Sequence, residues 1–179
     1  WQAAAQTAWQ RNPAQGRPEW QEGLEALSAV RDGSQPLVVT SEDALDTLRI
    51  FDMIDPETNL VIIGHGAEYQ RLDAIAARGV PHILPLNFPD APDVDEAEDT
   101  NANLNRDVSL EELRHWHQAP ENPSRLIEAG VPVLLTSHGQ SSPGNLFAAI
   151  ATAIERGLDA DQALAALTTG PAEWLGIED

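Results

Sequence analysis

Four short apolar runs, each ending abruptly in polar or glycine-rich residues, constrain the fold of this chain more than any other feature. They are PLVVT (36–40), LVII (60–63), HILPL (82–86) and VPVLLTS (131–137). Runs of this length, rich in Val, Ile and Leu, are typical of strands buried on both faces. Apolar residues at helical spacing separate them. Strands that alternate with helices predict an α/β protein with a parallel sheet and right-handed crossovers.

Start and stop signals place the helices between these runs. Ser41 is expected to cap a helix over 42–54, and Gly79 to end a helix over 67–78. Ser109 and Glu112 predict a capping box for a helix that ends near Gln118. Further helices are expected within 1–17 and over 18–33, 120–129, 143–156 and 159–168, with a last turn over 171–175.

These elements predict one partial β/α domain over residues 1–179. Residues 1–35 form a helical lead-in, 36–137 hold the four strands with their helices, and 138–179 form C-terminal helices. Acids, Asn and Pro over 90–107 predict a long loop, which suggests a lid or an exposed insertion. Four strand-helix units fit either half of an eight-stranded barrel or one small doubly wound sheet, and periodicity alone does not decide between them.

The charge balance excludes some partners. The chain has 29 acidic and 10 basic residues, for a net charge of -19. This surface repels phosphates and anionic lipids, so we expect neither a nucleic acid nor a membrane partner. No apolar run reaches the roughly 18 residues of a membrane helix. A soluble protein is therefore expected, with its compartment left open and the periplasm and the extracellular space among the options.

The ends of the four predicted strands offer the candidate site residues. Thr40 ends a predicted strand and His65, Asn87 and His138 each follow one, and loops at strand carboxyl ends are where parallel α/β folds build their sites. His65 in Gly-His-Gly and His138 in Ser-His-Gly hold equivalent positions in two units. Imidazole is a common zinc ligand, although each histidine could instead be a turn residue bonded to a local carbonyl.

The other histidines fit a metal site less well. His115 and His117 are two residues apart on a predicted helix, so their side chains point about 200° apart and cannot share an ion. We expect both to be surface groups. His82 opens a strand and is expected to be structural.

Longer segments resemble a known family. They are PLVVTSEDALDTLRIF (36–51), LVIIGHGAEYQRLDAIAARGVPHILPLNFP (60–89), APENPSRLIEAGVPVLLTSHG (119–139) and ALTTGPAEWLGIED (166–179). In this order and spacing they resemble the C-terminal half of the catalytic barrel in the amidohydrolase superfamily, closest to its imidazolonepropionase- and prolidase-like members. The resemblance implies half of a TIM-like (β/α)8 barrel, strands five to eight.

The resemblance also implies a metal site. In that family the fifth and sixth strands each end in a metal-binding histidine, and the eighth ends in an aspartate that binds metal and accepts a proton from water. His65 matches the sixth-strand histidine, whereas Thr40 and His138 replace the other two residues. We expect His65 and His138 to bind a divalent metal, zinc first. His138 is the catalytic candidate, and Thr40 and Asn87 are expected to contact substrate.

These substitutions affect the expected activity. Threonine is a poor zinc ligand, and a metal-bound imidazole cannot easily act as the base. The first hypothesis is a fragment of a metal-dependent hydrolase that cleaves an amide or peptide-like C–N bond of a small-molecule or peptide-like substrate by metal-activated water. The alternatives are a degenerate barrel module used for binding or scaffolding, and an independent small α/β domain. Exposed edge strands predict a homo-oligomer or a missing N-terminal half, and the chain alone is expected to be weak or inactive.

Overall fold

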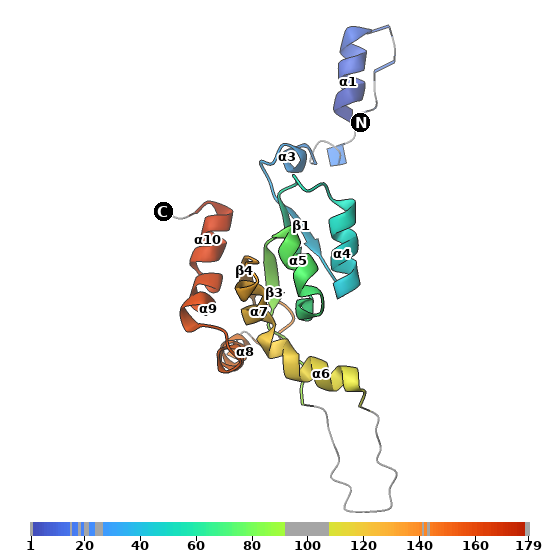
Figure 1. The fold of residues 1–179 in the computed structure, drawn as a ribbon. Coiled ribbons are helices and arrows are strands. Elements are labelled where there is room, and N and C mark those ends of the chain that lie inside the picture. Colours follow the sequence, from blue (N-terminus) through green and yellow to red (C-terminus); the bar gives the residue numbers. More distant parts are fainter. Residues whose placement is uncertain are drawn as a thin grey trace, which may run out of the picture. The chain divides into compact units, whose positions relative to one another are not determined.

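A computed structural model describes residues 2–14, 16–17, 19, 22–23, 27–91, 108–140, 142 and 144–177. The chain divides into two compact units (Figure 1). The first comprises Trp1–Leu37 and Glu57–Asn59, and the second comprises Val38–Pro56 and Leu60–Asp179. The predicted lead-in over 1–35 falls in the first unit, and the four-strand region falls almost wholly in the second.

The first unit holds the helices α1 (Gln2–Arg11) and α3 (Ser28–Arg31). The guanidinium of Arg17 lies over the Trp9 ring, 5.6 Å from its centroid. After α3, the carboxylate of Asp32 accepts hydrogen bonds from both the backbone amide and the hydroxyl of Ser34, which closes a turn before the first strand. Of the helix predicted over 18–33, α3 is the last turn, and residues 18, 20–21 and 24–26 lie outside the described residues.

Four strands form one sheet in the part of the chain that the structure describes. They are β1 (Leu37–Thr40), β2 (Leu60–Ile63), β3 (His82–Pro85) and β4 (Val133–Thr136), and their order in the sheet equals their order in the sequence. The pairs β2–β3 and β3–β4 are parallel, with Ile62 opposite His82 and Leu84 opposite Leu135. The α/β prediction with a parallel sheet is therefore confirmed.

Helices occupy every connection between neighbouring strands. Helix α4 (Ala44–Met53) follows β1, and the 3₁₀ turn η1 (Glu68–Arg71) and α5 (Leu72–Arg78) follow β2. After β3 come α6 (Leu110–Gln118), η2 (Ala119–Glu121) and α7 (Asn122–Glu128). After β4 come α8 (Gly144–Glu155), α9 (Ala160–Leu167) and α10 (Thr169–Leu175).

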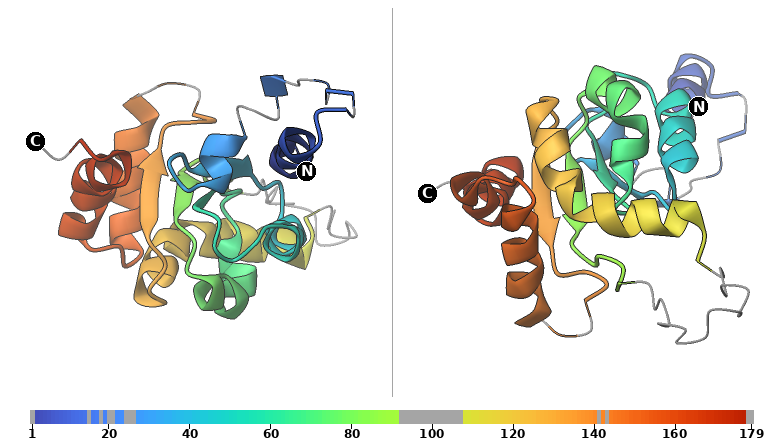
Figure 2. Two further views of the ribbon diagram at one scale, coloured as in Figure 1. Left: turned by 90° about the horizontal axis from the view of Figure 1, so that it is seen from above. Right: turned by 60° about the horizontal axis from the view of Figure 1, so that its bottom comes forward.

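The crossover helices share one face of the sheet. Figure 2 shows α4, α5 and α7 side by side on that face, and the contacts of α5 with both α4 and α7 agree with this arrangement. A doubly wound sheet would place helices on both faces, whereas a β/α barrel places them all outside. This arrangement therefore fits a partial barrel better than a small doubly wound sheet, the two alternatives that periodicity had left open.

The core lies between the sheet and its helices. Leu84 of β3 and Leu135 of β4 pack in one cluster with Ile75 of α5 and Leu126 of α7. Ile150 and other residues of α8 and α9 extend the same cluster. Burial of a side chain of this size contributes about 1.5–3 kcal/mol. The apolar runs of the sequence thus supply both the strands and one side of this core.

The start of α4 corrects one prediction. Asp43, and not Ser41, caps the helix, because its Oδ1 accepts hydrogen bonds from the amides of Leu45 and Asp46 at 2.7 and 2.8 Å. The Ser41 hydroxyl is buried and instead bonds the Thr47 hydroxyl at 2.6 Å. The helix consequently begins at residue 44, two residues later than expected.

Two other helix signals are confirmed. Ser109 and Glu112 form the predicted capping box at the start of α6, each side chain accepting from the other residue's amide. Gly79 ends α5 with φ at 65°, the left-handed conformation that glycine adopts without a Cβ clash.

Most of the predicted acidic loop, residues 92–107, lies outside the described residues. Among the described helices, none combines the length and the apolar character that crossing a membrane requires.

His82 is a buried structural residue, as expected. Its Nδ1 donates to the Val80 carbonyl oxygen at 2.7 Å, and its ring meets the Phe51 ring edge-on at 6.5 Å. Burial lowers the pKa of His82, while the bond to Val80 and the nearby Glu68 carboxylate oppose that shift in part. The neutral imidazole is therefore the form that the fold accommodates.

Replacing Asp43 by Ala is expected to lower the Tm by about 2–4 °C near neutral pH, because two helix amides lose their acceptor. Hydrogen bonds from these amides lower the pKa of Asp43, so its contribution is present above the unfolded pKa and is lost as pH falls through the folded one. Thermal unfolding across a pH series would measure both effects. Asp43→Asn is the matched control, since it keeps the cap without titrating. Equal Tm values for wild type and Asp43→Ala would contradict this assignment.

Replacing His82 by Gln is expected to flatten the pH dependence of stability between about pH 7.5 and pH 5.5. The pKa of His82 is lowered by folding, so stability is full above the unfolded pKa and falls as pH drops toward the folded one. Urea unfolding at several pH values would measure the slope. His117→Gln, on the exposed side of α6, should keep the wild-type slope. An unchanged slope in His82→Gln would show that His82 does not set it.

Candidate functional site

The four predicted site residues lie at the carboxyl edge of the sheet, each in the last position of a strand or in the loop after it. Thr40 ends β1, His65 follows β2, Asn87 follows β3 and His138 follows β4. Thr40, Asn87 and His138 are exposed, whereas the side chain of His65 is only 11% exposed. The structure thus brings the four residues to one edge but gives them different surroundings.

The loops after β3 and β4 contact each other. The side-chain amide of Gln140 donates to the Leu86 carbonyl oxygen at 2.5 Å. Gly139 has φ at 79°, and a Cβ added there would lie 3.1 Å from Nδ2 of the Asn87 side chain. His138 is positioned by its backbone, whose amide donates to the Thr136 hydroxyl at 3.2 Å. Asn87 and the His138 loop are therefore neighbours.

His65 is held in a defined pose. Its Nδ1 accepts a hydrogen bond from the amide of Ala67 at 3.3 Å. Its Nε2 is buried without a hydrogen-bond partner in the described part of the chain, and it lies 3.8 Å from Oε1 of Glu68. Because Nδ1 accepts, the ring proton of neutral His65 sits on Nε2.

A buried carboxylate beside His65 was missed by the sequence reasoning. Glu68, at the start of η1, is fully buried. Its Oε1 accepts from the amides of His65 and Gly66 at 2.6 and 3.2 Å, and its Oε2 accepts from the side-chain amide of Asn122 at 2.5 Å. Asn122 Oδ1 in turn accepts from the Tyr69 amide at 2.8 Å. Only the nearness of a glutamate to Gly-His-Gly could have pointed to it.

Gly64 makes room for this carboxylate. A Cβ added at Gly64 would overlap Oε1 of Glu68 and lie 2.9 Å from Cδ2 of Leu84. No sequence signal pointed to this close approach. The structure gives Gly64 a specific purpose, which is to let Glu68 reach the backbone of the turn.

His115 corrects another prediction. It was expected on the surface, but it is half-buried against η1, with Nδ1 3.0 Å from the Tyr69 hydroxyl and its ring stacked on Tyr69 at 6.2 Å. Burial lowers the pKa of His115, and His65 lowers it further. His117 is exposed, as expected.

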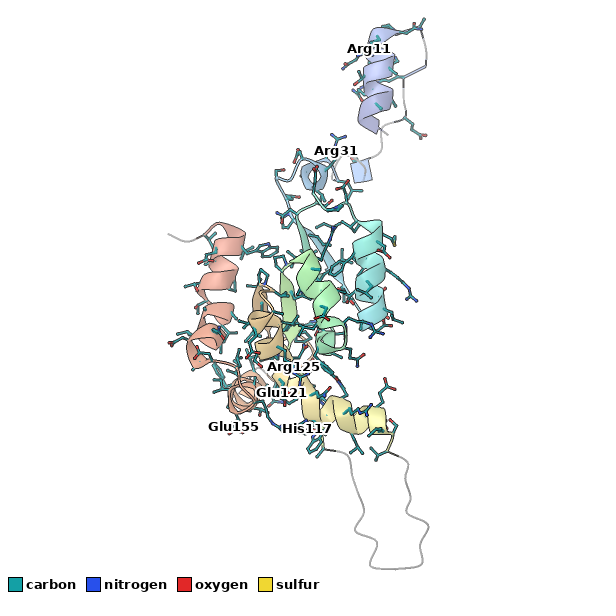
Figure 3. The ribbon with its side chains drawn as sticks, in the orientation of Figure 1. Arg11, Arg31, His117, Glu121, Arg125 and Glu155 are labelled. Atoms are coloured by element: carbon teal, nitrogen blue, oxygen red, sulfur yellow. The ribbon has the colours of Figure 1, made fainter. Side chains whose placement is uncertain are left out.

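Charged side chains surround the outer side of this cluster. Arg125 of α7 lies over the Tyr69 ring, 5.8 Å from its centroid, and pairs with Glu121 at 2.5 Å. Arg156 reaches the other oxygen of Glu121 at 3.8 Å. Figure 3 shows Glu121 and Arg125 beside each other. The guanidinium of Arg125 therefore covers one face of the Tyr69 ring, which belongs to η1.

The described residues do not fit a complete metal site. Among them, no group of three or more His, Cys, Asp or Glu side chains is arranged to hold an ion. Metal-bound histidines usually donate from their second ring nitrogen, whereas His65 accepts at Nδ1 and carries its proton on Nε2. Binding through Nε2 would require moving that proton to Nδ1 and losing the bond from Ala67.

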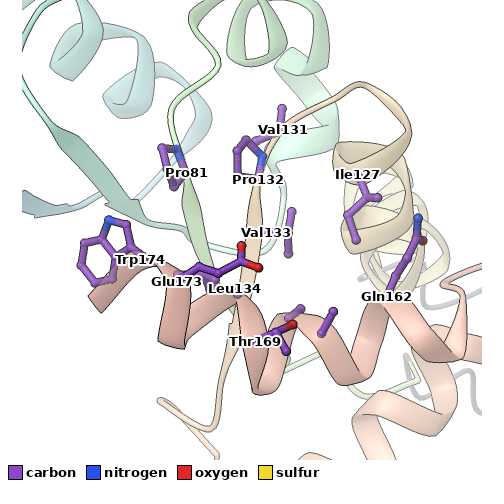
Figure 4. Close-up of a pocket in the computed structure, with 13 residues that line it drawn as sticks. Pro81, Ile127, Val131, Pro132, Val133, Leu134, Gln162, Thr169, Glu173 and Trp174 are labelled. Atoms are coloured by element: carbon purple, nitrogen blue, oxygen red, sulfur yellow. The ribbon is translucent and has the colours of Figure 1, made fainter. Parts of the chain in front are cut away.

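A groove of about 540 Å³ lies elsewhere, between β4 and the helices α9 and α10 (Figure 4). Its walls are mainly apolar and include Val133, Leu134 and Trp174. Its polar members are Gln162, Thr169 and Glu173. Pro81 and Pro132, which precede β3 and β4, also line it. The groove therefore opens near the amino ends of these strands, away from the candidate site.

Comparison with solved structures finds an amidohydrolase from Thermotoga maritima MSB8, with a TM-score of 0.70 and 22% sequence identity. The match covers 99% of this chain and 42% of that one, so the chain spans less than half the length of this amidohydrolase. No protein-family model and no curated protein matches the chain. The likeness establishes an amidohydrolase-like fold over the chain.

Replacing Gly64 by Ala is expected to lower the free energy of unfolding by about 1–3 kcal/mol, because the new methyl group would displace Glu68 or Leu84. Chemical denaturation would measure the loss. Gly144→Ala at the exposed start of α8 is the control, since a Cβ there meets only Ser142 at an ordinary 3.7 Å. If both variants were as stable as the wild type, Gly64 would not be needed for the close approach of Glu68.

Proposed function

We propose that this chain is the C-terminal part of the barrel of an amidohydrolase-like hydrolase that cleaves an amide or peptide-like C–N bond. The observation that carries the proposal is the fold correspondence with an amidohydrolase over 99% of the chain. The single helical face of the sheet supports it as well. In this proposal β1 to β4 are barrel strands five to eight, and the whole protein is of the imidazolonepropionase- and prolidase-like kind.

The residues at the carboxyl edge have distinct roles in this proposal. His65 takes the place of the sixth-strand histidine, and His138 stands where such enzymes hold a catalytic aspartate. Thr40 and Asn87 would contact a small-molecule or peptide-like substrate. Their exposure at the same edge of the sheet supports this assignment, because a substrate must reach them from solvent.

The metal dependence of such an enzyme needs more than the described residues. A divalent ion, zinc in the first instance, would supply an activated water in an enzyme of this kind. His65 and His138 could provide at most two ligands, and His65 would first have to change its tautomer. Further ligands would have to come from outside the described residues, for example from an N-terminal half of the barrel or from a second copy of the chain.

A barrel module without hydrolysis is the second candidate. Two observations favour it. Nδ1 of His65 accepts a hydrogen bond from Ala67, which leaves the ring proton and no free lone pair on Nε2, and an imidazole replaces the carboxylate expected at position 138. A module of this kind would keep the fold for binding or scaffolding, and its exposed edge strands would still favour association between copies.

Metal content and hydrolysis separate the two candidates. If the chain comes from a hydrolase and its own copies complete the metal site, we expect the purified protein to retain zinc and to hydrolyse some member of a dipeptide and cyclic amide panel weakly, with stimulation by added metal. His138→Asp should raise that activity roughly tenfold or more, because a carboxylate can serve as the base. Elemental analysis and product detection would measure both. His117→Asp, on α6, is the control and should change neither.

Other results would favour the module. A protein without bound transition metal and without metal-stimulated hydrolysis, in which His138→Asp gains nothing, would remove the support for hydrolysis by this chain. Light scattering on the same samples would test the predicted association between copies.

A further inference from the structure

We infer that Glu68 is a positioning residue which, together with Asn122, fixes the turn that presents His65 at the candidate site. The inference rests on the proposed function only in treating His65 as a residue of that site. The geometry that supports it is independent of any reaction. Three hydrogen bonds, a close approach of the backbone and complete burial all converge on this one carboxylate.

The carboxylate of Glu68 accepts the backbone hydrogen bonds that the Gly-His-Gly turn would otherwise donate to water. Both His65 and Gly66 donate their backbone amides to Oε1 of Glu68. A buried carboxylate is unfavourable unless such donors surround it. These bonds therefore fix the peptide groups on both sides of His65, and the bond from Ala67 to Nδ1 fixes the ring.

Asn122 fixes the carboxylate in turn. It lies 54 residues later, at the start of α7, and it uses both ends of its amide. Its nitrogen donates to Oε2 of Glu68, and its oxygen accepts from the Tyr69 amide. The turn after β2 is therefore attached to the helix that leads into β4, the strand that His138 follows.

Because each of these hydrogen bonds has a fixed donor and acceptor, variants of Glu68 and Asn122 can test their roles. In Glu68→Gln, the new amide can face its oxygen either toward the His65 and Gly66 amides or toward the Asn122 amide. In either orientation its NH2 group meets another donor, so one set of bonds is lost. In the double variant Glu68→Gln with Asn122→Asp, the glutamine can accept from the turn and donate to one oxygen of the new carboxylate. The second oxygen of that carboxylate still accepts from the Tyr69 amide.

The experiment uses the 179-residue chain labelled with ¹⁵N at histidine and at the backbone. The ring nitrogen shifts of His65 report which nitrogen carries the proton, and amide hydrogen exchange reports the bonds of His65 and Gly66. We expect Glu68→Gln to alter the His65 ring shifts and to speed exchange of these two amides roughly tenfold or more. The double variant should restore both to wild-type values.

Two controls separate positioning from a general loss of stability. Glu128→Gln changes the same charge on the exposed side of α7 and should leave His65 unchanged. The His117 ring, exposed on α6, serves as an internal reference in every sample. A residue with only a structural role would affect exchange throughout the chain and would not alter the His65 ring selectively.

Several results would overturn the inference. A folded Glu68→Gln protein with wild-type His65 shifts and exchange would show that the carboxylate does not position the ring. If that variant does not fold, a folded double variant with altered His65 signals would have the same meaning. Rapid exchange of the His65 and Gly66 amides in the wild type would refute the bonds without any variant. None of these readouts uses hydrolysis, so an inactive protein can still confirm the positioning role.

Discussion

Parallel pairing between strands that are consecutive in the sequence is the constraint on which the rest of the second unit depends. Each such pair requires a crossover long enough to return the chain to the same end of the sheet, and right-handed crossovers between consecutive neighbours place their helices on one face. The core between β3, β4, α5 and α7 follows from that placement. The gathering of Thr40, His65, Asn87 and His138 at one edge follows as well, because parallel strands all end there.

Local signals in the sequence were sufficient to locate the four strands and several helix ends of this fold. Apolar runs located all four strands, with ends that differ from the structure by at most two residues. The Ser109 capping box and the Gly79 helix end were predicted because the partners of each lie within a few residues. The start of α4 shows the limit of such signals. Ser41 and Asp43 are both good capping residues, and the choice depends on which side chain reaches the free amides while the other is buried against Thr47.

The candidate site was less predictable because its interactions join distant segments. Glu68 meets Asn122 across 54 residues, and Tyr69 meets His115 across 46. Helical geometry correctly separated His115 from His117, but it could not supply the Tyr69 ring that half-buries His115. The tautomer of His65 was equally hidden, since it depends on the amide of Ala67. The nature of the groups at strand ends can be read from a sequence, whereas their protonation depends on neighbours that only the fold supplies.

The bond between Glu68 and Asn122 also has a consequence for the order of folding. Before α7 docks, Oε2 of Glu68 can be hydrogen-bonded only by water, so burying the carboxylate would be unfavourable. The turn that holds His65 can therefore reach its final form only after α7 has docked beside it. Closing the loop of 54 residues between Glu68 and Asn122 is slower than forming a local helix. Secondary structure around β2 should precede the completed site, and the histidine should be the last part of that turn to become ordered.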